Sequence, residues 1–218
     1  DRLEKVPDRD KEIGAIIADV MNRHGRIIFN GNNYSEAWVQ EAKRRGLPIL
    51  DSSVEAFDCL TAPKNIALFK RHCVFTEPEC LSRVEILLEN YSKVLAIESA
   101  TMIEMVRRQV YPAVVRYTGE LAETLNRMRT AGALSESTVR VLGTLTALID
   151  QIDSELDALR DAFARSQSIE DLHEHAVFMR DTVCGCMDSL RAACDAAEHI
   201  LDFESWPIPT YTDLLLRV

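Results

Sequence analysis

The chain has 218 residues, a formal net charge of −10 and 47% hydrophobic residues. This length suits one ordinary domain or two small ones with a packed core. No apolar run reaches the ~18 residues needed to cross a membrane, and no signal-peptide pattern opens the chain, so we expect a cytoplasmic protein. With only 8 Gly and 7 Pro, the composition favours helices. A start at Asp1 without Met suggests an excised fragment or a processed product.

The negative charge is concentrated near the C-terminus. Residues 135–218 hold 6 Lys and Arg against 16 Asp and Glu, whereas residues 1–75 hold 12 against 11. Such an acidic segment would repel nucleic acid. We interpret it as a solvated helix face, and we expect neither nucleic acid nor a membrane as a partner.

We expect residues 1–75 to form a docking region of short helices. The first helix, over residues 8–24, is amphipathic because apolar residues recur on one side at helical spacing: Ile13, Ile16, Ile17, Val20 and Met21. Gly25 is a suitable end for this helix. Two more short helices are expected, one after Ser52 or Ser53 and one from Pro63.

A cluster of polar and aromatic residues lies between these helices: Asn30, Gly31, Asn32, Asn33, Tyr34 and Trp38. Asn-Gly is a turn signal, and Gly31 permits a positive φ. Ser35 is expected to cap a helix through Arg45 that ends at Gly46. Three interpretations stand for the cluster: docking on another surface, a turn that leads into the helix, or contact with a ligand.

We expect residues 76–204 to form an up-down-up bundle of three long antiparallel helices with coiled-coil-like packing. A tail over residues 205–218 should follow. A capping box at Thr76 starts the first helix, which runs to about Arg129 and should bend at Pro112. Its expected core face contains Leu81, Val84, Leu88, Tyr91, Leu95, Met102, Val106, Val110, Val114, Tyr117, Leu121, Leu125 and Met128.

The second and third helices carry a heptad pattern of apolar residues. Ser135 should cap the second, whose seam contains Leu142, Leu145, Ile149, Ile152, Leu156, Leu159 and Phe163. Ser168 should cap the third, whose seam contains Ile169, Leu172, Ala176, Met179, Val183, Cys186, Leu190, Ala193, Ala197 and Ile200. The whole chain is therefore expected to be all-α.

The residues that could carry chemistry are few. Glu98 falls on or beside the apolar stripe, where a carboxylate is more often tied to a neighbouring arginine than used as a general acid. His173, His175 and His199 suit solvated surface positions. No phosphate-binding loop, nucleophile motif or metalloprotease motif is present. We therefore predict no catalytic, cofactor-binding or metal-binding residue.

The six cysteines form no Cys-x-x-Cys pair. Cys184 and Cys186 would point to different faces of a helix and could not bind one ion together. His72, Cys73 and Cys80 are close in sequence but form only a weak metal pattern. We expect reduced and mostly buried thiols.

Three segments carry a resemblance to a known family: RIIFNGNNYSEAWVQEAKRRGLPIL at residues 26–50, IESATMIEMVRRQVYPAVVRY at residues 97–117, and WPIPTYTDLLLRV at residues 206–218. They resemble the C-terminal region of type III glutamine synthetases. The resemblance implies a parent enzyme that joins ammonia to glutamate with ATP and Mg²⁺, as a large homo-oligomer of stacked rings. It also implies that the catalytic residues lie upstream of this chain, in a catalytic domain on which residues 1–75 dock.

Two other classes remain open. A free-standing scaffold or adaptor would use the acidic bundle to bind a basic partner. A phosphotransfer bundle would carry the phosphoryl group on His173 or His199. Whether the domain regulates its parent or only shapes the oligomer does not follow from the sequence.

Overall fold

The computed structural model describes residues 2–4 and 6–216, and within these ranges the chain is all-α, without a strand. Contacts divide it into two compact units, residues 1–52 and residues 53–218. We call them the N-terminal unit and the long-helix unit. The division precedes the boundary expected after residue 75, because the helices over residues 53–71 have their contacts within the long-helix unit. No helix of the described ranges is long and apolar enough to cross a membrane.

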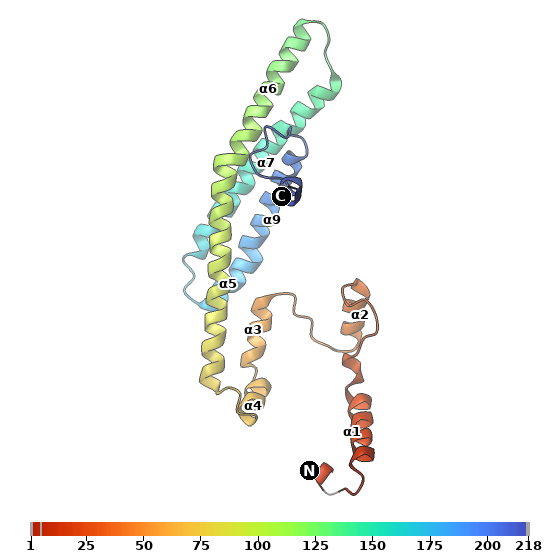
Figure 1. Cartoon of the computed structure of the whole chain (residues 1–218). Helices are drawn as coiled ribbons and strands as arrows, with labels where there is room; N and C mark the ends of the chain where they lie inside the picture. Colours follow the sequence, from red (N-terminus) through yellow and green to blue (C-terminus); the bar gives the residue numbers. More distant parts are fainter. Residues whose placement is uncertain (1, 5, 217–218) are drawn as a thin grey trace. The chain divides into compact units, whose positions relative to one another are not determined.

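The N-terminal unit contains two α-helices, α1 (Arg9–His24) and α2 (Glu36–Arg44), and short 3₁₀ turns at Arg2–Glu4 and Gly25–Ile27 (Figure 1). Asp8 caps α1 by accepting a hydrogen bond from the Lys11 N–H at 3.1 Å. Gly46 follows α2 with a φ of 66°, the left-handed conformation that commonly closes a helix. The ends predicted for these helices are thus confirmed.

The long-helix unit begins with two short helices, α3 (Ser53–Thr61) and α4 (Pro63–Arg71), and α3 packs against α5 (Glu77–Met105). Val54 of α3 is buried with Val84 and Leu88 of α5 in a small core. The predicted capping box at Thr76 is present, with the Glu79 carboxylate accepting from the Thr76 N–H at 2.7 Å.

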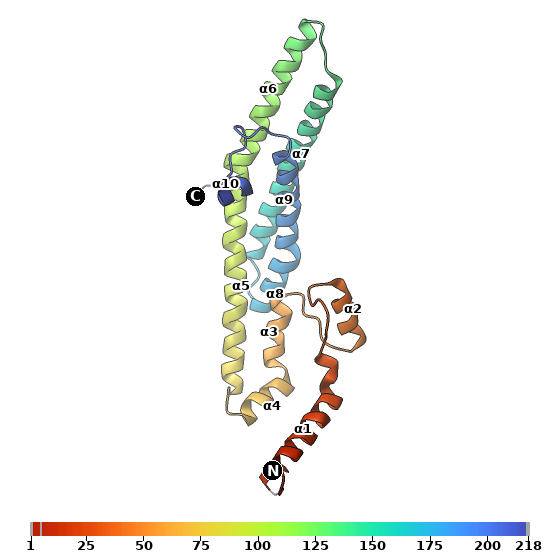
Figure 2. The ribbon, with the colours of Figure 1, turned by 45° about the vertical axis from the view of Figure 1, so that its right-hand side comes forward.

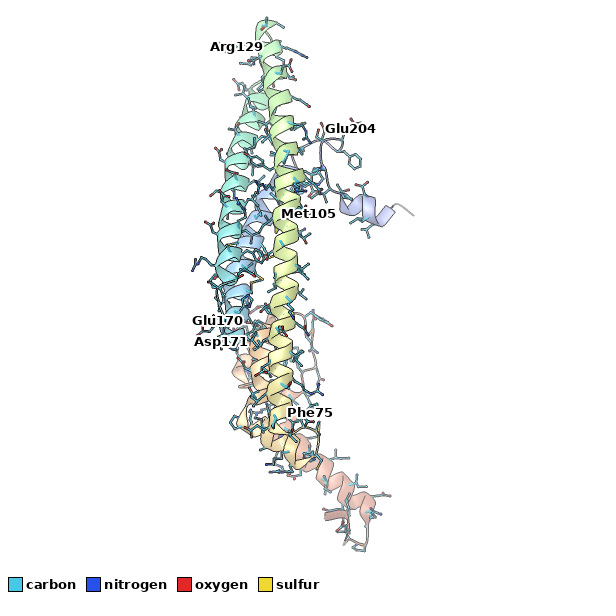
Figure 3. The ribbon with its side chains drawn as sticks, turned by 90° about the vertical axis from the view of Figure 1, so that its left-hand side faces the viewer. Phe75, Met105, Arg129, Glu170, Asp171 and Glu204 are labelled. Atoms are coloured by element: carbon cyan, nitrogen blue, oxygen red, sulfur yellow. The ribbon has the colours of Figure 1, made fainter. Side chains whose placement is uncertain are left out.

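The helix that starts at α5 continues without a break through a π-helical segment (Val106–Val110) into α6 (Tyr111–Thr130), as Figure 3 shows between Phe75 and Arg129. Pro112 has no N–H, and in an α-helix its ring would clash with the carbonyl four residues earlier. The chain adopts a wider turn just before it, in which the Tyr111 N–H bonds to the Val106 carbonyl five residues back. The helix therefore continues past Pro112, as predicted, with the irregularity confined to one turn.

The chain then reverses twice. Gly132, with a φ of 73°, lies in the first turn, and Ser135 caps α7 (Glu136–Ser166) by accepting from the Thr138 N–H. The second turn leads to α8 (Leu172–Phe178), a π-helical segment (Met179–Val183) and α9 (Cys184–Glu198), with α9 packed chiefly on α7 (Figure 2).

The cap predicted for the third long helix is wrong. The Ser168 hydroxyl donates to the Arg165 carbonyl, which belongs to the end of α7. Asp171 caps α8 instead, accepting from the Glu174 N–H at 2.8 Å. Both residue types favour caps, so residue type alone does not identify which of them starts the helix.

The main core lies among α6, α7 and α9 and the π-helical segments. Its fully buried large side chains are Val110, Val114, Leu145, Ile152, Leu159, Met179, Val183 and Leu190. All eight were predicted. Leu148 and Ala162 are also buried, next to Ile149 and Phe163, which the pattern favoured and which are half-buried.

Two predicted core residues are exposed. Leu81 is 47% exposed, and its neighbour Cys80 is buried in its place. Leu172 is 39% exposed because it opens α8 at the end of the unit. The segment after α9 returns to the core through Trp206 and Ile208, and α10 (Tyr211–Leu216) follows.

Candidate functional site

The loop before α2 is held by hydrogen bonds around Asn32. The Asn32 side-chain oxygen accepts from the Tyr34 N–H at 3.0 Å, and the Asn32 carbonyl accepts from the Ser35 hydroxyl at 2.7 Å. Ser35 does occupy the N-cap of α2, but its hydroxyl makes no bond to the helix. The polar residues of this cluster therefore build a fixed turn.

The aromatic residues of the cluster pack on one another. The Phe29 and Trp38 rings lie 4.6 Å apart between centroids. A Cβ atom added at Gly31 would lie 2.6 Å from the Phe29 ring. As a glycine, Gly31 permits a positive φ, but Gly46 and Gly132 are the positive-φ glycines of the described ranges. A larger residue at Gly31 would instead require the far end of the Phe29 ring to move.

Arg45 connects this loop to α2. Its guanidinium donates to the carbonyls of Arg26 and Ile28, and its Nε donates to Glu41 at 2.5 Å. Hydrogen bonds from Arg44 and then Arg45 lower the pKa of Glu41 to about 2. Arg45 was predicted only as the last residue of a helix, because a bond to carbonyls about 20 residues away leaves no local pattern.

The same unit exposes apolar side chains to solvent. Tyr34 is 100% exposed, and four residues of the α1 stripe are at least 40% exposed: Ile13, Ile17, Val20 and Met21. Large contiguous apolar surfaces on soluble proteins commonly mark interaction sites. A turn fixed by hydrogen bonds that exposes Tyr34, on a unit with an exposed apolar stripe, has the features of a docking surface. Docking was one of the three interpretations of the sequence.

The residues singled out for possible chemistry are dispersed. Glu98 is exposed on α5, so it is not a buried carboxylate. His173 of α8 lies with its Nε2 atom 3.0 Å from the Asp58 carboxylate of α3. His199 is exposed, as predicted. His175 is half-buried with its Nε2 atom buried and unpartnered, so its predicted solvated position is wrong.

All six cysteines are free, but only Cys80 and Cys194 are buried, so the expectation of mostly buried thiols is wrong. Burial, and secondarily Asp195, raise the pKa of Cys194 to about 11. Cys73 is exposed and Cys80 is buried, so the two thiols of the weak His72 pattern lie in different environments. Over residues 2–4 and 6–216, no three His, Cys, Asp or Glu side chains are placed to hold a metal ion.

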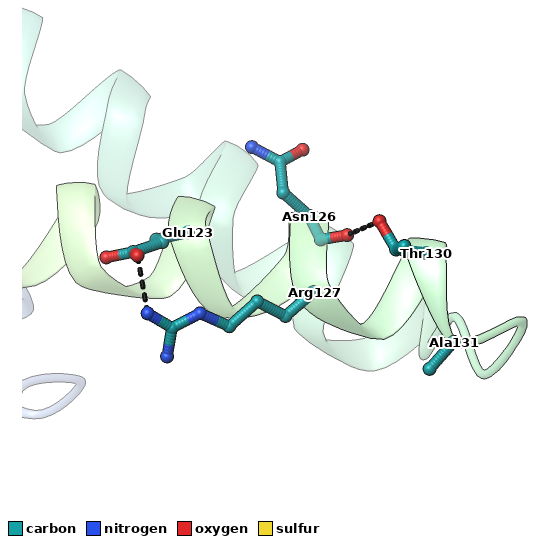
Figure 4. A pocket seen from close by; sticks show the side chains of 5 residues that line it. All are labelled: Glu123, Asn126, Arg127, Thr130 and Ala131. Carbon is teal, nitrogen blue, oxygen red and sulfur yellow. Dashed lines mark hydrogen bonds and ion pairs between the residues drawn. The ribbon is translucent and has the colours of Figure 1, made fainter.

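One surface depression lies near the end of α6, lined by Glu123, Asn126, Arg127, Thr130 and Ala131 (Figure 4). The charged groups and the Thr130 hydroxyl of this depression are engaged within the helix. Arg127 pairs with Glu123 at 2.5 Å, and the Thr130 hydroxyl donates to the Asn126 carbonyl at 2.9 Å. These are ordinary contacts of an exposed helix, and they leave no convergent group for a substrate.

The chain is similar to known proteins along most of its length. The model of the glutamine synthetase C-terminal domain matches residues 12–129. A glutamine synthetase of Butyrivibrio fibrisolvens is 32% identical over 95% of this chain. A type-3 glutamine synthetase of Dictyostelium discoideum and a glutamine synthetase of Bacteroides fragilis are each 30% identical over 98% of it. The chain spans about 30% of the length of each relative. The chain belongs to the glutamine synthetase C-terminal domain family.

Proposed function

We propose that this chain is the C-terminal helical domain of a type III glutamine synthetase and that it has no catalytic role of its own. The parent reaction would be the ATP-dependent ligation of ammonia to glutamate, with ATP and Mg²⁺ bound outside this chain. The observation that carries the proposal is the pattern of the matches. Nearly the whole chain aligns with each relative but covers about 30% of that relative's length, and one of the three is named a type-3 enzyme.

The proposed role is structural or regulatory. The partners would be the catalytic domain of the same polypeptide and other subunits of a cytoplasmic homo-oligomer. Exposed Tyr34 and the exposed stripe of α1 support docking, because burial of apolar area is what drives such association. The long-helix unit would supply a rigid arm, in which seams at three- and four-residue spacing pack as in an up-down-up coiled-coil bundle.

The chemistry of the described side chains supports the absence of catalysis from this chain. Phosphoryl transfer to a carboxylate needs converging cations and metal ligands around the nucleotide. Here several of the described arginines form surface ion pairs with nearby acids, for example Arg108 with Glu104 at 3.2 Å and Arg160 with Asp157 at 2.9 Å.

The test is a ligase assay with glutamate, ammonia, ATP and Mg²⁺. We expect no ATP-dependent glutamine formation by the 218-residue chain. We expect activity from a longer polypeptide in which the upstream sequence of a relative precedes it. Glutamine formed by the chain alone would contradict the proposal.

The docking role has its own test in the longer polypeptide. Ile17→Asp places a charge on the exposed stripe of α1, where the residue is 58% exposed and its replacement should not disturb folding. We expect it to shift the oligomer to smaller species in light scattering. Ala15→Asp adds the same charge at an exposed position of α1 outside the stripe and is the matched surface control. Equal behaviour of the two variants would argue against docking through α1.

A further inference from the structure

A groove of about 660 Å³ lies in the long-helix unit, between α5 with its π-helical segment and α9. The α5 side extends from Ile97 to Val110 and the α9 side from Met187 to Glu198. At 1.5 Å per residue these walls are ~20 Å and ~17 Å long. The segment Trp206–Leu214 closes part of the groove, which belongs to none of the features assigned above.

The floor of the groove is apolar and rich in methionine. It is lined by Met102, Met105, Val106, Met187, Trp206 and Ile208. Methionine side chains are flexible and polarizable, and they are common on surfaces that accept helices of varied sequence. Ile97, at the edge, is 68% exposed, so apolar surface continues out of the groove into solvent.

The rim of the groove is acidic. Glu98 projects from α5, and Asp188, Asp195 and Glu198 project from α9. Among the described residues that line the groove, Arg191 is the single cation, and it lies 3.3 Å from Asp195. The rim therefore favours a positively charged partner, and it disfavours an acidic one by like-charge repulsion.

The dimensions distinguish between kinds of occupant. Small-molecule pockets commonly enclose most of their ligand, whereas this groove is open along two parallel helices. A helix of three turns is ~16 Å long and 10–12 Å wide with its side chains, which matches the length of both walls. An amphipathic helix binds such a groove through apolar residues at i, i+3, i+4 and i+7.

We propose that this groove binds an amphipathic helix of a partner protein, about three turns long, whose apolar stripe is flanked by lysines and arginines. The apolar stripe would lie on the methionine floor, and the flanking cations would lie against the acidic rim. This interaction is distinct from the docking proposed for the N-terminal unit and does not depend on the parent enzyme's activity.

Trp206 provides a direct signal, because it lines the groove and the chain has 2 Trp. In a Trp38→Phe background, which keeps an aromatic ring against Phe29, fluorescence reports the groove alone. Two synthetic helical peptides with the same leucine stripe serve as probes, one with lysine flanks and one with glutamate flanks. We expect saturable binding of the lysine peptide and at least ~10-fold weaker binding of the glutamate peptide.

Matched charge variants test the location. Glu98→Gln with Asp188→Asn removes two of the four rim carboxylates, and Asp150→Asn with Asp153→Asn removes the same charge from exposed positions of α7. We expect the rim variant to bind the lysine peptide ~10-fold more weakly than the unchanged chain. The α7 variant should change the affinity for this peptide by less than ~2-fold. Circular dichroism serves to check that both variants remain folded.

Three outcomes would overturn the proposal. Equal weakening by the two variants would mean non-specific attraction to an acidic protein. Equal affinity for the two peptides would remove the role of the rim. Binding of 4-phenylbutylammonium to the groove, without binding of the lysine peptide, would identify a small-molecule site in place of a helix site.

Discussion

Truncation of Leu190 tests how the long helices pack. Leu190 lies on α9 in the main core and is 0% exposed. Leu81 on α5 is 47% exposed, although the sequence pattern placed it in the core as well. Leu→Ala at both positions is the same chemical change in two environments, so the difference between the variants measures burial and cavity formation alone.

The expected magnitudes follow from burial. Truncating a fully buried leucine typically costs ~2–5 kcal/mol, the sum of lost transfer energy and the cavity that remains. Complete burial of a leucine side chain contributes about 1.5–3 kcal/mol. Leu81 has about half of its surface in water and borders solvent, so Leu81→Ala should cost only ~1 kcal/mol.

The assay is thermal unfolding followed by far-UV circular dichroism. For chains of 150–250 residues, 1 kcal/mol shifts the melting temperature by about 2–4 °C. A loss of ~3 kcal/mol in Leu190→Ala therefore lowers the melting temperature by roughly 6–12 °C. Leu156→Ala, at a position 6% exposed, should behave like it, and Asp157→Ala should change stability by no more than about 0.5 kcal/mol.

Equal melting temperatures for Leu190→Ala and Leu81→Ala would refute this reasoning. The face of α9 that contains Leu190 would then not be the one that packs on α7. If Leu81→Ala were the more damaging variant, the exposed stripe at the start of α5 would be an interface with another molecule.

Two further predictions concern titratable groups. Because the pKa of Glu41 is lowered from 4.5 to about 2, its ion pairs stabilise the N-terminal unit fully above pH 4.5 and lose this effect as the pH falls toward 2. An NMR titration of the Glu41 carboxyl should show a midpoint near 2, and a midpoint above 4 would contradict it. The exposed thiol of Cys73 should react with an aromatic disulfide reagent at pH 8, whereas Cys194, with a pKa of about 11, should stay unmodified until the chain unfolds. Equal rates for the two cysteines would contradict the burial of Cys194.

Local signals gave the helix boundaries in most places. A capping box is contained within four consecutive residues, so Thr76 and Glu79 identify the start of α5 without any knowledge of the fold. Glycines with positive φ close α2 and α6 in the same way. Where two good caps lie three residues apart, as Ser168 and Asp171 do, the choice depends on how the preceding helix ends, and that depends on packing.

The candidate docking surface was predicted in part. The turn of Asn32 and the position of Ser35 follow from residue types that bond to their own backbone. The contact of Arg45 with the carbonyls of Arg26 and Ile28 does not, because it joins residues that are brought together only when the unit folds. The steric need for Gly31 depends equally on the placed ring of Phe29.

The groove between α5 and α9 was not predicted, because the apolar residues of the first long helix were expected to lie on one face along its whole length. The buried residues Cys80, Val84, Leu88 and Ser92 recur every four residues. Since an α-helix turns about 100° per residue, three such steps rotate the buried face by about 120°. The start of α5 therefore faces α3, whereas its end faces α7 and α9.

The π-helical segment before Pro112 further changes the direction in which the buried side chains point. It buries Val106 and Val110, four residues apart, on a turn wider than an α-helical one. In the preceding turns, the buried Ser99 hydroxyl lies 3.2 Å from the Met187 sulfur, a contact that brings α5 and α9 together there. Val106 and Val110 of this segment also line the groove. The irregular turn that accommodates Pro112 is therefore part of the groove wall, which local sequence patterns could not have indicated.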